Sequence, residues 1–160
     1  MQIANRHPTM RERSPLSGSR SSRELQRAPR VLLVDDDPAL LRATQRFIGS
    51  ARPNWQLRTA YTTRDALIEL RSRHFDVLVT DIDLGGRSGL ELLDTVHREF
   101  PNLACVIHSA QVETYAGHPS LMVAVAMLRK TCQPQELVAA LTDALWASIR
   151  AVETSTRAAG

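Results

Sequence analysis

The sequence predicts an α/β protein built on a doubly wound, five-stranded parallel sheet. From Arg30 onward, strand-like and helix-like segments alternate, which is the pattern of βα units on a parallel sheet. The run Val77 to Val79 is aliphatic without alternation, as in a strand buried on both faces, and a glycine-rich turn follows it. A length of 160 residues with 43% hydrophobic content suits one such domain with short tails.

Each element is expected from its own pattern. Strands are expected at residues 30–34, 57–61, 77–79, 103–108 and 123–128. Helices are expected at 38–48, 63–72, 88–100 and 134–146, where apolar residues recur at three- and four-residue spacing. Between residues 111 and 123, Gly117, His118 and Pro119 interrupt what should be a fifth helix, so that helix is expected to be short or displaced.

The chain is predicted to comprise an Arg- and Ser-rich disordered tail (1–28), the domain (29–147) and a short polar C-terminal tail (148–160). Residues 1–30 carry seven arginines against two glutamates, a net +5, whereas the other 130 residues carry 13 basic and 15 acidic groups, a net −2. The first tail has too few apolar residues to offset its ordering entropy. Two other roles for this tail stay open. It could be an organellar transit peptide, or its positive charge could attract an acidic partner or nucleic acid.

Several classes of protein are disfavoured. No apolar segment approaches the roughly 20 residues of a membrane helix, and the N-terminus lacks the apolar core of a secretory signal. Cys105 and Cys132 have neither a CxxC spacing nor a disulfide framework, so two reduced thiols are expected. We therefore expect a soluble cytoplasmic protein without membrane partners.

Polar side chains stand at the carboxyl ends of four predicted strands. Asp35 and Asp36 follow the first, Asp81 the third, Ser109 the fourth and Lys130 the fifth. Each alone could be a helix cap, a turn former or a solvated surface group. Because parallel strands bring their carboxyl ends to one rim, where ligands bind in such sheets, we expect the five side chains to lie together.

This set of side chains suits phosphoryl chemistry. Clustered carboxylates repel one another unless a hard cation lies among them, and Mg²⁺ prefers carboxylate, water and phosphate oxygens. With the metal in place, Asp81 could attack a phosphoryl group and form an acyl phosphate, with Lys130 as counter-charge. Ser109 would hydrogen-bond the attached group and move its loop, a two-state element biased by a local charge change.

Four segments in order, Val31-Leu-Leu-Val-Asp-Asp-Asp-Pro38, Phe75-Asp-Val-Leu-Val-Thr-Asp81, Ser109-Ala110 and Lys130, resemble the receiver domain of bacterial two-component response regulators. The resemblance covers residues 29–147 and implies a flavodoxin-like (βα)5 fold. It implies a signalling domain that catalyses only its own phosphotransfer and dephosphorylation. A histidine kinase or phosphotransfer protein would be the phosphoryl donor, and the downstream target would be another protein or a homodimer.

The same resemblance assigns roles residue by residue. Asp35, Asp36 and Asp81 would hold Mg²⁺, with the backbone carbonyl of Asp83 completing the metal site. Asp81 would be the phospho-acceptor, Ser109 the switch hydroxyl and Lys130 the phosphate-sensing lysine. Asp83 and Gln111 take the positions that influence how fast the phospho-aspartate hydrolyses.

Three residues depart from the family pattern. Gly85 and Thr131 stand where the family usually has proline, which alters loop stiffness. Met127 takes the place of the aromatic residue that swings inward on activation, although a methionine repacks readily. Together with the interrupted segment 111–123, Met127 predicts an unusual output face and a partner or dimer mode particular to this protein.

Two other functions stay open. A DNA-binding module would need about 50 or more residues after the last helix, so direct DNA binding is not expected and a single-domain receiver is the leading hypothesis. A non-phosphorylated pseudo-receiver would act as an interaction module alone. The segment Asp81-Ile-Asp83 also resembles the nucleophile motif of haloacid-dehalogenase-type phosphatases, but Asp35 and Asp36 precede it, whereas the metal-binding carboxylates of that family follow the motif.

Overall fold

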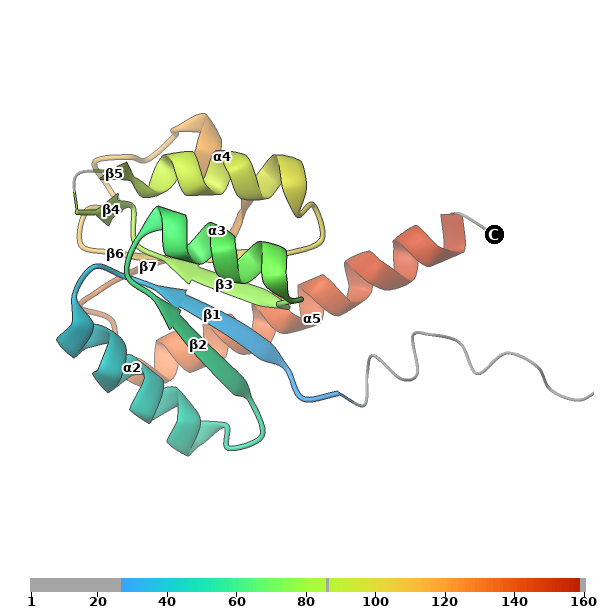
Figure 1. The fold of residues 1–160 in the computed structure, drawn as a ribbon, viewed down its shortest axis with the longest axis horizontal. Coiled ribbons are helices and arrows are strands. Elements are labelled where there is room, and N and C mark those ends of the chain that lie inside the picture. The colour runs from blue at the N-terminus through green and yellow to red at the C-terminus, as the bar shows by residue number, and fades with distance from the viewer. Residues whose placement is uncertain (1–26, 86, 159–160) are drawn as a thin grey trace, which may run out of the picture.

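The computed structural model describes residues 27–85 and 87–158, with side chains as far as Arg150 apart from those of Arg87 and Ser88 (Figure 1). Most of the predicted tail, residues 1–26, lies outside the described residues. The elements run in the order β1 (Arg30–Val34), α2 (Pro38–Ala51), β2 (Gln56–Ala60), α3 (Thr63–Ser72), β3 (Val77–Thr80), β4 (Asp83–Leu84), β5 (Arg87–Ser88), α4 (Gly89–Glu99), β6 (Ala104–Ser109), the 3₁₀ helix η1 (Pro119–Val123), β7 (Ala124–Arg129) and α5 (Pro134–Ala158).

Five strands form one parallel sheet in the order β2-β1-β3-β6-β7. This is the strand order of flavodoxin-like folds, and it confirms the predicted doubly wound sheet. The short strands β4 and β5 form a separate antiparallel pair. Since all five strands of the large sheet point the same way, their carboxyl ends meet at one rim, on the left in Figure 1.

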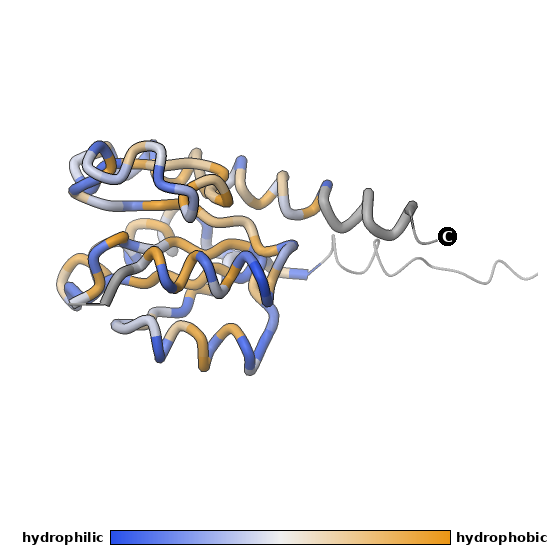
Figure 2. Tube along the Cα trace, turned by 90° about the horizontal axis from the view of Figure 1, so that it is seen from above, coloured by the Kyte–Doolittle hydropathy of each residue, from blue (hydrophilic) through white to orange (hydrophobic). Residues whose placement is uncertain are grey.

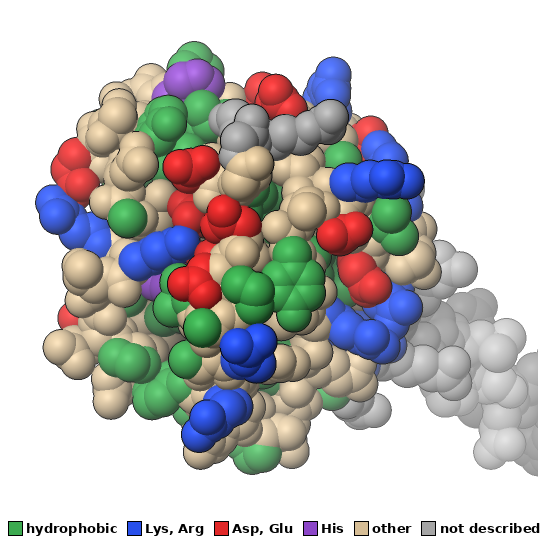
Figure 3. All heavy atoms as spheres, turned by 60° about the vertical axis from the view of Figure 1, so that its left-hand side comes forward, with side chains coloured by type: hydrophobic (Ala, Val, Ile, Leu, Met, Phe, Trp, Pro, Cys, Tyr) green, Lys and Arg blue, Asp and Glu red, His purple; other side chains and the backbone are tan. Residues whose placement is uncertain are grey.

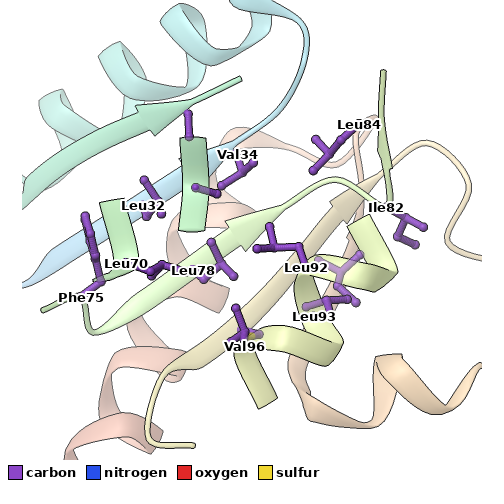
Figure 4. Packing of buried hydrophobic residues seen from close by; sticks show 14 of the residues in the cluster. Leu32, Val34, Leu70, Phe75, Leu78, Ile82, Leu84, Leu92, Leu93 and Val96 are labelled. Carbon is purple, nitrogen blue, oxygen red and sulfur yellow. The ribbon is translucent and has the colours of Figure 1, made fainter. Parts of the chain in front are cut away.

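A hydrophobic core fills each face of the sheet. On one face, Leu32, Val34 and Leu78 pack against residues of α3 and α4 such as Leu70 and Leu92 (Figure 4). On the other face, alternate residues of the same strands pack against α2 and α5. Figure 2 shows orange and blue alternating along the described helices, as expected for helices with one face on the sheet.

The element between β6 and β7 is a 3₁₀ helix, at the place where the sequence predicts a short or displaced helix. Turns lead from Ser109 to η1, which spans five residues, so four α-helices lie in the described part of the chain. Pro119 opens η1 and the side chain of His118 accepts a hydrogen bond from the Ser120 amide, which fixes the start of this short helix. The expectation of a short or displaced helix is confirmed.

The last helix is longer than predicted. α5 runs to Ala158, whereas the sequence predicts a helix that ends at Trp146 and a short polar tail over 148–160. The segment beyond Trp146 contains no glycine or proline before Gly160, so nothing in it stops the helix. Ser148 also donates to the backbone oxygen of Asn102 (3.2 Å), which ties α5 to the turn between α4 and β6. No helix of the described residues is long and apolar enough to cross a membrane.

The chain before β1 is fixed to the domain through Asp76. The buried carboxylate of Asp76, just before β3, accepts two hydrogen bonds from the guanidinium of Arg27 and one from the amide of Arg30 (2.8 Å). His74 Nε2 lies 3.3 Å from the same carboxylate. Burial raises the pKa of Asp76, but the hydrogen bonds from His74, Arg27 and Arg30 outweigh it and lower the pKa to about 2.

We expect Arg27→Ala to lower the free energy of unfolding at pH 7 by roughly 1–2 kcal/mol, because it leaves a buried carboxylate short of two hydrogen bonds. A depressed carboxyl pKa contributes stability above the unfolded-state value and loses it as the pH falls toward about 2. The difference between variant and wild type should therefore shrink on acidification, as urea unfolding at several pH values would measure. Removing residues 1–26 should have no such effect.

The matched control is Arg71→Ala, which removes an equally bidentate pair with Glu99 on the exposed surface. Water already solvates that pair, so its loss should be the smaller one. An equal loss of unfolding free energy in the two variants would show that the Asp76 contact stabilises the protein no more than a surface ion pair does.

Gly89, the first residue of α4, lies against the backbone that follows β3. A Cβ at this position would lie 2.1 Å from the carbonyl oxygen of Asp81 and 2.9 Å from that of Ile82. The amide of Gly89 donates to the same Ile82 oxygen at 2.6 Å. Any side chain here would therefore push α4 away from the Asp81 backbone.

We expect Gly89→Ala to destabilise the protein by about 1–3 kcal/mol, because backbone rather than a flexible side chain must move. The control is Gly49→Ala within α2, where the added Cβ would meet only Leu57 Cδ1 at 3.9 Å. That change should be neutral or stabilising by up to about 1 kcal/mol, since alanine favours helix more than glycine does. Thermal unfolding of both variants measures the contrast.

Candidate functional site

Three carboxylates meet at the carboxyl rim of the sheet. Oxygens of Asp35, Asp36 and Asp81 lie within 4.8 Å of one another. Figure 3 shows acidic side chains gathered on this face with a basic side chain beside them. Asp35 and Asp81 are buried and Asp36 is exposed. The structure thus brings together the acidic residues that the sequence analysis placed at two different strand ends.

The turn after β1 is fixed by its own aspartates. Asp35 Oδ1 accepts a hydrogen bond from the Asp37 amide (2.9 Å), and the Asp35 amide donates to the carbonyl of Ala60 on the neighbouring strand. Asp37 caps α2, accepting from the amides of Ala39 and Leu40. The third aspartate of the run therefore orders the helix start, and the first two are left to face the rim.

Asp81 is held at the junction of β3 and the following loop. Its amide donates to the carbonyl of Val34 on β1, and its own carbonyl accepts from the hydroxyl of Thr80 (2.9 Å). The Asp83 amide donates to Asp81 Oδ1 at 3.2 Å. These contacts fix the direction of the carboxylate, and the Cβ-free Gly89 allows α4 to begin directly behind it.

Lys130 joins the two buried carboxylates. Its Nζ lies 2.8 Å from Asp35 Oδ2 and 2.5 Å from Asp81 Oδ2. Its backbone amide donates to the carbonyl of Ser109, so the loop after β7 is tied to the end of β6. Burial lowers the pKa of Lys130, but the hydrogen bonds to both aspartates outweigh it and raise the pKa above its ordinary value.

The donor set fits a hard divalent cation. Three carboxylates against one ammonium leave net negative charge at the rim, and oxygen donors within a few ångströms of one another are what Mg²⁺ binds. Asp36, exposed and at the edge of the group, leaves the site open toward solvent. An ion bound here could keep several waters and take phosphate oxygens as further ligands.

The other predicted residues take different positions. Ser109 is buried at the end of β6, and its hydroxyl accepts from the amide of Gln111 (3.3 Å). Asp83 is exposed on the short strand β4. Met127 lies on β7, paired with Ile107, and its side chain is 46% exposed. Met127 thus lies on the surface of the edge strand, away from the buried end of the site.

Sequence reasoning missed a contact behind the site. His108, buried at the end of β6, lies with Nε2 3.9 Å from Cys132 Sγ. Burial lowers the pKa of His108, and the charge of Lys130 lowers it further, against the opposing effect of Asp35 and Asp81. A histidine directly before Ser109 inside an otherwise apolar run was the signal in the sequence that could have pointed to it.

Comparison with known proteins identifies the family to which the chain belongs. Residues 31–142 match the family model described as the response regulator receiver domain. The chain is 31% identical over 102 residues to the nitrogen assimilation regulatory protein NtrX of Azorhizobium caulinodans, covering 62% of this chain and 20% of that protein. It is 29% identical over 109 residues to the alginate biosynthesis transcriptional regulatory protein AlgB of Pseudomonas aeruginosa, covering 68% of this chain and 24% of AlgB. The chain therefore spans a fifth to a quarter of these relatives.

Solved structures share the fold over most of the chain. The signal receiver domain of an HD domain-containing protein from Pseudomonas fluorescens Pf-5 is 25% identical, with a TM-score of 0.73 over 80% of this chain and 94% of that one. The response regulator TrrA of Thermotoga maritima is 22% identical, with a TM-score of 0.67 over 72% of this chain and 98% of that one. The family model and the fold agree with the resemblance found in the sequence: the chain belongs to the response regulator receiver domain family.

Proposed function

We propose that the protein accepts a phosphoryl group on Asp81 and signals through a contact with another protein. One observation carries the proposal: the ammonium of Lys130 bridges Asp81 and Asp35 inside a group of three carboxylates. A structural ion pair would need one carboxylate, whereas a phosphoryl site needs an acceptor, a cation site and a counter-charge together.

In this proposal Asp35, Asp36 and Asp81 hold Mg²⁺, and the backbone carbonyl of Asp83 completes its coordination. TrrA, which has the same fold, was solved in complex with Mg²⁺-BeF. Bound at the rim, the ion would neutralise charge on the phosphoryl oxygens. The surrounding chain would position the Asp81 carboxylate, and the ammonium of Lys130 would offset the negative charge of the neighbouring aspartates.

The transfer forms one bond and breaks one. An Asp81 carboxylate oxygen bonds to phosphorus as the bond from phosphorus to the donor nitrogen of a phosphohistidine, or to the oxygen of a small acyl phosphate, breaks. The leaving imidazole or carboxylate keeps the electron pair. Lys130, already in contact with Asp81 Oδ2, would move its contact to a phosphoryl oxygen.

The signal would pass through the loop between β6 and η1. The Lys130 amide donates a hydrogen bond to the Ser109 carbonyl. Ser109 Oγ accepts a hydrogen bond from the Gln111 amide, at the start of the turns that lead to η1. A hydroxyl that turned toward the phosphoryl group would release that amide and shift the loop. Met127, the second predicted switch residue, would take part by repacking on the exposed face of β7.

The direct test is phosphorylation by a small donor. We expect the full chain to gain the mass of one phosphoryl group when incubated with Mg²⁺ and acetyl phosphate, and Asp81→Asn to abolish the gain. Asp143→Asn, an exposed aspartate on α5, is the matched control and should be phosphorylated as in wild type. Chelating Mg²⁺ with EDTA should also stop the reaction.

Other outcomes select the alternative functions. No mass gain with acetyl phosphate, phosphoramidate or a phosphorylated histidine phosphotransfer protein would support a pseudo-receiver. Steady release of phosphate from simple phosphate esters, abolished by Asp81→Asn, would support a phosphatase of the haloacid-dehalogenase type.

We expect Asp83→Asn to shorten the life of the phosphorylated form by about fivefold. The exposed Asp83 side chain places a negative charge beside the group that water must attack, and one such charge in a solvated setting contributes about 1 kcal/mol to the barrier. Loss of the phosphoryl mass over time measures the rate. Slower hydrolysis would show instead that Asp83 orients the water, and an unchanged rate would argue against any role.

A further inference from the structure

A groove of about 500 Å³ lies between α4, the turn into β6 and η1, away from the acidic site. Most of its lining is apolar, and Asp94 and His97 of α4 also border it. The apolar residues include Val96, Phe100, Leu103, Cys105, Met122 and Val123. The groove borders the segment between β6 and β7, where the sequence predicts a short or displaced helix and the chain forms the five residues of η1. In Figure 1, η1 is the orange segment beside α4 at the top of the molecule.

A large apolar side chain projects from the edge of this groove. Met122 is 84% exposed, whereas its neighbour Leu121 is 6% exposed. Leaving a methionine in water forgoes the favourable free energy of burying it, and a flexible thioether can fill an irregular hollow. A protruding apolar group and a hollow of apolar lining thus lie next to each other on one surface.

The exposed charges of α4 are divided between its two halves. Glu91 and Asp94 lie toward the start of the helix, and His97 and Arg98 lie toward its end, all four exposed. Glu99, the last residue of α4, is also exposed, but its carboxylate is paired with Arg71 of α3. The spacing of Glu91, Asp94 and Arg98 places them along one stripe of the helix. A second α4 running antiparallel would therefore set acidic groups against basic ones.

We propose that α4 and η1 form the interface of a homodimer with two-fold symmetry, in which Met122 of each copy enters the groove of the other. A two-fold contact uses the same surface patch twice, so it requires a patch that complements itself. This patch does so in shape, through Met122 and the groove, and in charge, through the two halves of α4. The inference does not depend on phosphorylation of Asp81.

The test uses sedimentation velocity on the full unphosphorylated chain across micromolar to millimolar concentrations. We expect wild type to be in a monomer–dimer equilibrium, and Met122→Asp to raise the dissociation constant at least about tenfold, since each dimer buries two copies of the residue. The matched control is Ile68→Asp, an exposed isoleucine on α3 outside the groove, which should leave the equilibrium unchanged.

A charge exchange tests the orientation of the two helices. Asp94→Arg should weaken the dimer, and adding Arg98→Asp to the same chain should restore it, because an antiparallel contact pairs one position with the other. Circular dichroism of each variant would show that the fold is kept.

Three results would overturn the proposal. One is a wild-type chain that stays monomeric at every concentration, which would leave the groove to a small apolar ligand or to a different protein. The second is a dimer that Met122→Asp does not weaken. The third is a dimer that Ile68→Asp weakens equally, which would move the interface to α3.

Discussion

The carboxylates of Asp35 and Asp81, both almost fully buried, lie together at the ends of β1 and β3. The ammonium of Lys130 is in contact with both. Like charges in such a setting repel strongly, so this arrangement is stable only with a cation in contact with it. Much of the local structure serves this contact. The Val34 carbonyl fixes the Asp81 amide, the Ser109 carbonyl fixes the Lys130 amide, and the parallel register of β1, β3, β6 and β7 brings the three segments to one rim.

The two ends of the sheet use charge differently. At the carboxyl rim, three acidic groups share one lysine, and the remaining negative charge favours a divalent cation. At the amino end, the single carboxylate of Asp76 is satisfied by the Arg27 guanidinium, the Arg30 amide and His74, which leaves no comparable excess of charge. The contacts of Asp76 fix the chain that enters the domain. Asp76 is as buried as Asp35 and Asp81, so the number of partners for each carboxylate, and not burial, distinguishes the two ends of the sheet.

The segment between β6 and β7 gives this receiver its individual surface. Turns and the short helix η1 join β6 to β7, a groove lies between η1 and α4, and Val125 and Met127 are exposed on the edge strand β7. Because that segment begins at Ser109, the same stretch of chain borders both the acidic site and the groove. A change at Ser109 would therefore reach this surface through only a few turns of backbone. The long helix α5, which continues to Ala158, adds a second feature that sets the domain apart from the sequence-based expectation.

Local patterns were enough to predict the fold and the grouping of Asp35, Asp36, Asp81 and Lys130 at one rim. Uninterrupted aliphatic runs marked strands buried on both faces, and polar residues directly after those runs marked the rim, since a parallel sheet leaves no other place for them. The short helix η1, which begins at Pro119, was also foreseeable, because glycine and proline act on the local backbone. Local patterns did not determine what depends on contacts between distant segments: Arg27 with Asp76, His108 with Cys132, the approach of Gly89 to the Asp81 backbone, and the hollow beside Met122. The end of α5 was predicted too early, although no glycine or proline follows Trp146 before Gly160. The hydrogen bond from Ser148 to the Asn102 carbonyl, in the turn before β6, is another contact between distant segments that local patterns do not show.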